Sequence, residues 1–151
     1  MMAVVDTPTL ISLAWSGQLK LLAMTPIELL VPDVVRDEAV TAGIAGGYAD
    51  AAAIETAIGP LASVATRPAE NIDNAVLATA IDVGMLMSND LALGRRAANL
   101  GARWLRTADL ILACTRTGSV SAEDGRAALS ALHAAGRVSP ALLASYLEEI
   151  I

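Results

Sequence analysis

Residues 3–19, AVVDTPTLISLAWSGQL, begin the chain with a strand and a helix. Ala3 to Val5 is a short run rich in β-branched residues, which favours a strand that ends at Asp6. Pro8 suits the first turn of a helix, and an apolar segment continues from it to Trp15. This unit predicts an α/β protein.

The same alternation continues along the chain. Further strands are predicted at residues 29–31, 61–65, 85–87 and 103–105, with helices between them and a glycine-rich loop that begins at Gly43. Short strands alternating with helices are typical of a parallel sheet covered on both faces. We therefore expect a single domain over residues 1–151, built as a three-layer α/β/α sandwich. The last two helices, at about 119–151, form an appended helical pair in this prediction.

Composition limits the class of protein. The chain has 151 residues, of which 55% are hydrophobic and 3% aromatic, so its core is expected to consist of aliphatic side chains. No apolar run reaches the ~18 residues of a spanning helix, and no basic residue precedes Lys20 as in a secretory signal. The sequence therefore predicts a cytoplasmic protein that does not cross a membrane. Its surplus of apolar residues favours a homodimer.

The net charge of −6 counts against binding to a phosphate backbone, which depends on Lys and Arg contacts. The charges are unevenly distributed, however. Four arginines and no acid lie between Leu91 and Ala108. Arg95 and Arg96 are candidate contacts to a nucleic acid, with a solvated helix face as an equal alternative.

Four carboxylates are the candidate site. Ligands of an open parallel sheet bind at the carboxyl ends of its strands, and both Asp6 and Asp90 follow predicted strands. Glu38 and Asp73 border the apolar faces of predicted helices. Such oxygen ligands suit Mg²⁺ or Mn²⁺. Taken one at a time, these acids also have ordinary explanations as helix caps, first-turn acids or solvated charges.

Other polar and aromatic residues suggest less. Trp15 and Trp104 are expected in the core, and His133 has no partner with which to act as a general base. Cys114 lies in an apolar helix and is expected to be buried; as the single cysteine it excludes an internal disulfide.

Several segments together resemble the PIN-domain family, in particular its small prokaryotic branch of predicted nucleic-acid-binding proteins related to VapC toxins. The similar segments are VVDTPTLISL (residues 4–13), GQLKLL (17–22), VP at 31–32 with Val35 and Glu38, DNAVLATA (73–80) and GMLMSND (84–90). Pro8 departs from the family pattern, where a Ser is common, and no second acid follows Asp90 closely.

This resemblance implies a metal-dependent ribonuclease, in which Asp6, Glu38, Asp73 and Asp90 hold one or two Mg²⁺ or Mn²⁺ ions. It also implies that Ser88 and Asn89 orient Asp90 or a water. The expected partners are an RNA substrate, a small antitoxin protein if the chain is a toxin, and a second copy of the chain. The alternative is a binding module on the same fold without catalysis.

Other α/β proteins with acidic sites fit less well. A response-regulator receiver needs a lysine late in the sheet, whereas Lys20 is the single lysine here. Pro8 occupies the place of the second acid of an Asp-x-Asp phosphatase. Dinucleotide-binding and P-loop motifs are absent from the sequence.

Overall fold

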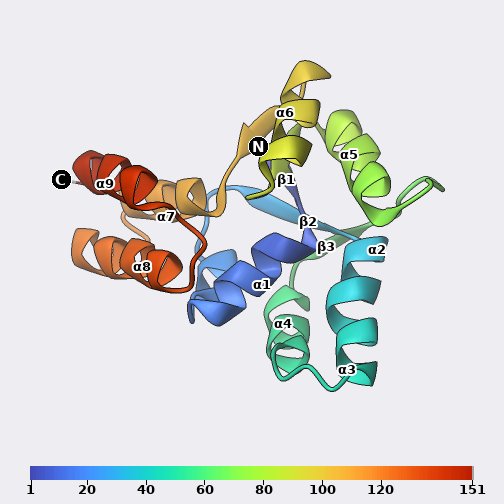
Figure 1. Ribbon diagram of the computed structural model, residues 1–151, viewed down its shortest axis with the longest axis horizontal. Helices are drawn as coiled ribbons and strands as arrows, with labels where there is room; N and C mark the ends of the chain where they lie inside the picture. The colour runs from blue at the N-terminus through green and yellow to red at the C-terminus, as the bar shows by residue number, and fades with distance from the viewer. Residues whose placement is uncertain (151) are drawn as a thin grey trace.

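A parallel sheet forms the centre of the protein. The computed structural model describes residues 1–150, and within them five parallel strands lie in the order β3-β2-β1-β4-β5 (Figure 1). The strands are β1 (Met2–Val5), β2 (Glu28–Pro32), β3 (Ala62–Val64), β4 (Met85–Met87) and β5 (Arg103–Leu105). The central strands β1 and β4 are apolar throughout because helices cover both of their faces.

Helices cover the sheet on both sides, which confirms the predicted α/β/α sandwich (Figure 1). On one side lie α1 (Thr7–Trp15), the 3₁₀ helix η1 (Leu19–Ala23) and α4 (Asp50–Ile58). On the other side lie α5 (Ile72–Val83) and α6 (Leu91–Asn99), which contact β4. None of the helices in the described part of the chain combines the length and the apolarity needed to cross a bilayer.

The segment after β2 is helical for longer than expected. It consists of α2 (Asp33–Arg36), the π-helical stretch η2 (Asp37–Ala42) and α3 (Gly43–Ala45). The prediction that Gly43 begins a loop is therefore wrong. A Cβ atom at Gly43 would lie 2.9 Å from the Cβ of Ala51, so this glycine allows α4 to approach closely. The chain leaves the helix at Gly46 and Gly47, the latter with a φ of 74°.

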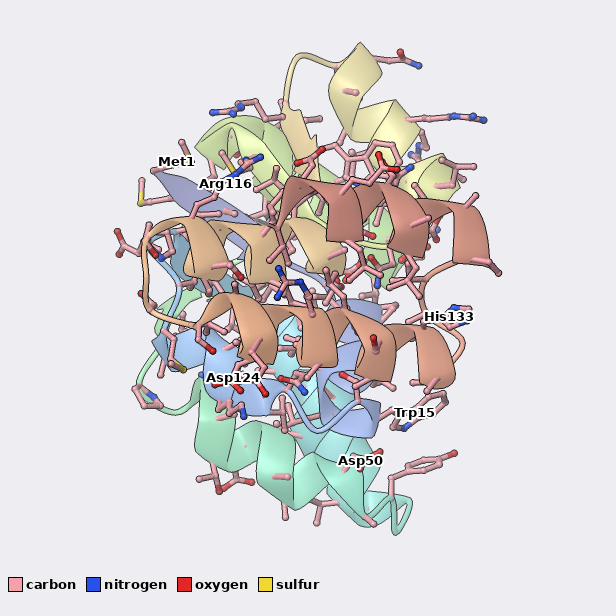
Figure 2. The ribbon with its side chains drawn as sticks, turned by 90° about the vertical axis from the view of Figure 1, so that its left-hand side faces the viewer. Met1, Trp15, Asp50, Arg116, Asp124 and His133 are labelled. Atoms are coloured by element: carbon pink, nitrogen blue, oxygen red, sulfur yellow. The ribbon has the colours of Figure 1, made fainter. Side chains whose placement is uncertain are left out.

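The C-terminal helices pack against the sandwich. They are α7 (Thr107–Arg116), α8 (Ala122–Ala134) and α9 (Pro140–Glu149), which lie side by side in Figure 2. Leu129 and Leu132 of α8 are fully buried in the same cluster as the strand residues. Tyr146 of α9 donates a hydrogen bond to Oδ1 of Asp109 at 2.8 Å.

Trp15 corrects a second expectation, because its side chain is 58% exposed instead of buried. The apolar face of α1 is formed by Leu10 and Leu13, which are fully buried. Trp15 follows Leu13 by two residues, so it points to a different side of the helix. Cys114 is buried, as expected.

Candidate functional site

Two of the four carboxylates meet at the carboxyl ends of adjacent strands. β1 and β4 are neighbours, with Val5 opposite Met87. The chain runs outward from β1 to β2 and β3 and then returns to β4, so the strand order reverses between β1 and β4. Such a switch point is where open α/β sheets bind their ligands. Asp6 and Asp90 stand there, close enough for Asp90 to act electrostatically on Asp6.

Asp6 is the most unusual residue of this edge. It is only 3% exposed, and it forms no ion pair within residues 1–150. Its Oδ1 accepts hydrogen bonds from the backbone N–H of Thr9, at 3.0 Å, and from the Thr9 hydroxyl. Its Oδ2 accepts from the hydroxyl of Ser88. The carboxylate is thus held by neutral donors, with no positive charge to balance it.

Burial dominates the electrostatics of Asp6. Removing the carboxyl from water raises its pKa above the usual value of 3.8, and the negative charge of Asp90 raises it further. Hydrogen bonds from Ser88 and Thr9 favour the charged form, but the net pKa remains raised. A bound cation would stabilise the ionised carboxylate.

Ser88 links the two acids. Its fully buried hydroxyl donates to Asp6 and accepts from the backbone N–H of Asp90 at 3.0 Å. Asp90 itself is exposed and caps α6, since its Oδ1 accepts from the N–H of Leu93 at 3.0 Å. Its Oδ2 accepts no hydrogen bond from residues 1–150. The cap explanation of Asp6 and Asp90 is thus realised, and each residue still presents its carboxylate to the switch point.

Glu38 and Asp73 do not join this pair. Both side chains are exposed, Glu38 on η2 and Asp73 in the first turn of α5, which Asn71 caps. Within residues 1–150, no three or more His, Cys, Asp or Glu side chains are grouped closely enough to hold a metal ion. The structure therefore brings together Asp6 and Asp90 and leaves Glu38 and Asp73 exposed at the rim.

Arg95 and Arg96 are exposed on α6. The guanidinium of Arg96 donates to Oδ1 of Asn74 at 2.9 Å, which places it beside the first turn of α5 that carries Asp73. Neither arginine forms an ion pair with an acid in the described part of the chain. Both charges are free for an external anion.

Threonine side chains near the carboxylates were not among the residues expected from the sequence. Thr7 and Thr107 are 5% and 0% exposed, and their hydroxyls have no hydrogen-bond partner in residues 1–150. The same holds for Nδ2 of Asn89, whose Oδ1 accepts from the N–H of Thr107 at 3.0 Å. Buried polar groups without partners call for a bound water, ion or ligand. The available signal was the position of Thr107, two residues after a third parallel strand.

Comparison with known proteins gives the family. The model of a family described as PIN domain matches residues 2–151. Among solved structures, the chain is similar to a PilT N-terminus domain protein from the hyperthermophilic archaeon Sulfolobus solfataricus P2, with 13% identity and a TM-score of 0.48, over 80% of this chain and 95% of that one. No curated protein matches. Because the family model spans almost every residue, the chain belongs to the PIN-domain family, whose members are generally nucleases.

Proposed function

We propose that this protein is a ribonuclease that uses Mg²⁺ or Mn²⁺ to hydrolyse phosphodiester bonds at the β1–β4 switch point. The observation that carries the proposal is Asp6, a buried carboxylate without a balancing cation beside a second carboxylate. Burying an unpaired charge destabilises the folded state by roughly several kcal/mol.

The residues present fit one hard cation. Mg²⁺ is commonly held by one or two carboxylates, with water and substrate phosphate in the remaining positions. Asp6 and Asp90 supply two such carboxylates, and Oδ2 of Asp90 accepts no hydrogen bond in residues 1–150. When bound, the ion would lower the pKa of a water and offset the negative charge on the phosphate.

The other residues have roles that follow from their positions. Ser88 holds Asp6 and Asp90 in a fixed relation, and Asn89 and Thr107 offer buried polar atoms without partners that would bind a water. Glu38 and Asp73, exposed at the rim, would act on the cation through water. Arg95 and Arg96, on the neighbouring helix, would bind the RNA backbone.

The biological setting is proposed from the VapC-like resemblance. In it, the protein is a toxin that is neutralised by a small antitoxin protein, and it acts as a homodimer. Purification with a small partner would support this setting, and a lone monomer at micromolar concentration would count against it.

The test of function is cleavage of short labelled RNAs in Mn²⁺ or Mg²⁺, with EDTA as the negative control. Asp90→Asn is expected to reduce the rate by about 10³-fold, because several kcal/mol of electrostatic stabilisation are lost and each 1.4 kcal/mol is tenfold. Glu123→Gln, an exposed acid on α8, is the matched control and should cleave like the wild type. Equal cleavage by the wild type and Asp90→Asn would indicate a contaminating nuclease and favour a non-catalytic binding module.

Metal affinity should fall as the pH is lowered. A proton on Asp6 competes with the cation, and the raised pKa of Asp6 means that this competition begins at a higher pH than for an ordinary aspartate. Titration calorimetry with Mn²⁺ at several pH values between 5 and 8 measures the effect. An affinity that falls at no higher pH than expected for an ordinary aspartate would contradict Asp6 as a ligand of the ion.

A further inference from the structure

An apolar groove opens directly beside the carboxylates. It has a volume of about 430 Å³ and runs between α1, η2 and α4. Its lining includes Thr7, Ile11, Trp15, Glu38, Tyr48 and Asp50. Thr7 directly follows Asp6, so the groove begins at the switch point. Its volume lies within the range of small-molecule sites, roughly 300–1,000 Å³.

Two exposed aromatic rings line this α1–α4 groove. Trp15 is 58% and Tyr48 is 73% exposed, although aromatic residues make up only 3% of the chain. Trp15 has two polar contacts. Its Nε1 donates a hydrogen bond to Oδ2 of Asp50 at 2.7 Å, and Figure 2 labels both residues. The guanidinium of Arg137 lies 4.2 Å from the centroid of the Trp15 ring. An exposed indole that is fixed in this way needs no reordering before a flat ligand stacks on it.

The charged groups of the groove, Glu38 and Asp50, are hydrogen-bond acceptors. Asp50 forms no ion pair within residues 1–150, and its Oδ1 accepts no hydrogen bond there. No Lys or Arg is part of the lining. The groove therefore does not suit a phosphate. It suits an uncharged ligand with a flat apolar face and N–H donors along one edge.

A guanine base has this chemistry. Its N1–H and N2–H₂ donors lie side by side on one edge and match the two oxygens of a carboxylate, while its face stacks on an aromatic ring. Uracil offers a single N–H between two carbonyl oxygens, which a carboxylate repels. Adenine and cytosine offer one amino group next to a ring acceptor. Guanine is thus the base that Asp50 and Trp15 together select.

We propose that the α1–α4 groove binds a guanine base of the RNA strand whose phosphate lies at Asp6 and Asp90. The proposal rests on the proposed ribonuclease function for the source of the base, and it adds a sequence preference to that function. Stacking and hydrogen bonding at one base are each worth roughly tenfold or more in affinity, so cleavage near G should be clearly favoured.

Binding is tested with guanosine and uridine, which carry no phosphate and need no metal. The chain has two Trp residues, so a ¹⁵N-labelled sample gives two indole N–H signals, which Trp15→Phe assigns. Guanosine should shift the Trp15 signal and leave that of Trp104 in place, whereas uridine should bind about tenfold more weakly or not at all. Equal binding of both nucleosides, or of neither, would overturn the proposal.

Variants identify the residue that selects the base. Asp50→Asn keeps an oxygen that can accept from Trp15 but loses one acceptor, so the preference for guanosine should disappear. Glu55→Gln is the matched control on α4, because this exposed acid lies outside the groove lining and should leave the preference unchanged. A preference that survives Asp50→Asn would contradict the assignment.

Cleavage separates this inference from the proposed function. The RNAs UGUU and UUUU are compared in Mn²⁺, and UGUU should be cleaved roughly tenfold or more faster. Equal cleavage of both RNAs would agree with the proposed ribonuclease function and contradict the preference for guanine. Guanosine binding without any RNA cleavage would support the guanine site in the groove and contradict the proposed ribonuclease function. If nucleosides fail and an apolar cationic peptide shifts the Trp15 signal, the groove belongs to a protein partner and the proposal falls.

Discussion

Asp6→Asn is expected to stop RNA cleavage and, at the same time, to raise the melting temperature of the metal-free protein at pH 7. The first effect follows from the loss of the buried carboxylate that would hold the cation, and a decrease of about 10³-fold or more is expected. The second follows from its burial. Above the pKa of the unfolded chain, folding must either protonate Asp6 or bury its charge, and the amide avoids both costs.

The amide fits the same position. Its oxygen can accept from the N–H of Thr9, and its NH₂ can donate to the hydroxyl of Ser88, which accepts as well as donates. The substitution therefore removes the charge and keeps a hydrogen bond to Thr9 and to Ser88, but the buried hydroxyl hydrogen of Ser88 loses its acceptor, which reduces the gain in stability. Each kcal/mol gained raises the melting temperature by roughly 2–4 °C in a domain of this size.

The gain should depend on pH. The pKa of Asp6 is higher in the folded than in the unfolded chain, so protonation of Asp6 stabilises the folded state. This stabilisation is complete below the unfolded pKa and is lost as the pH rises through the folded pKa. The advantage of Asp6→Asn should accordingly be largest at neutral pH and disappear in acid.

Thermal melts of both proteins in EDTA, from acid to pH 8, measure this dependence. Asp82→Asn is the control, because Asp82 is exposed and its ion pair with Arg67 is also exposed, so little change is expected. In saturating Mn²⁺ the order should reverse, since the wild type alone gains binding energy. An Asp6→Asn protein that melts below the wild type in EDTA at pH 7 would contradict the inference that burial of the Asp6 carboxyl destabilises the metal-free protein.

Gly94→Ala is expected to destabilise the protein. The same change in the middle of an ordinary helix increases stability by about 1 kcal/mol. A Cβ atom at position 94 would lie only 2.0 Å from Cε2 of Trp104 and 2.4 Å from its Nε1. The indole of Trp104 must therefore move, which breaks the hydrogen bond from its Nε1 to the carbonyl oxygen of Ser88 at 2.8 Å. A net loss of about 2 kcal/mol or more is expected, or roughly 4–8 °C in melting temperature.

Thermal melts of Gly94→Ala, Trp104→Leu and the double variant measure the effect. If the clash causes the loss, Gly94→Ala should lower the melting temperature much less in the Trp104→Leu protein than in the wild type, because the indole that the alanine would clash with is absent. An equal cost in both backgrounds would place the cause elsewhere in α6. Because Trp104 contacts the backbone of Ser88, cleavage by Gly94→Ala should fall as well.

The strands of the parallel sheet could be predicted because each depends on residues that are adjacent in the sequence. Each buried strand is a short apolar run that ends at a turn residue, and Met85–Met87 before Ser88 is a clear example. The helical conformation of Gly43 could not be predicted because it depends on a distant contact. The missing side chain leaves room for Ala51 of α4, and no residue near Gly43 in the sequence indicates that contact. The exposure of Trp15 could not be predicted for the same reason, since its partners Asp50 and Arg137 are distant in sequence.

The sequence by itself determined the alternation of strands and helices and the placing of Asp6 and Asp90 after strands, because side-chain pattern and chain order set both. Only the tertiary structure decided that β1 and β4 are neighbours, which brings the buried Asp6 and the exposed Asp90 together around Ser88. It also left Glu38 and Asp73 exposed at the rim and opened the groove beside Trp15. These features depend on how helices from distant parts of the chain pack, and local sequence does not record that packing.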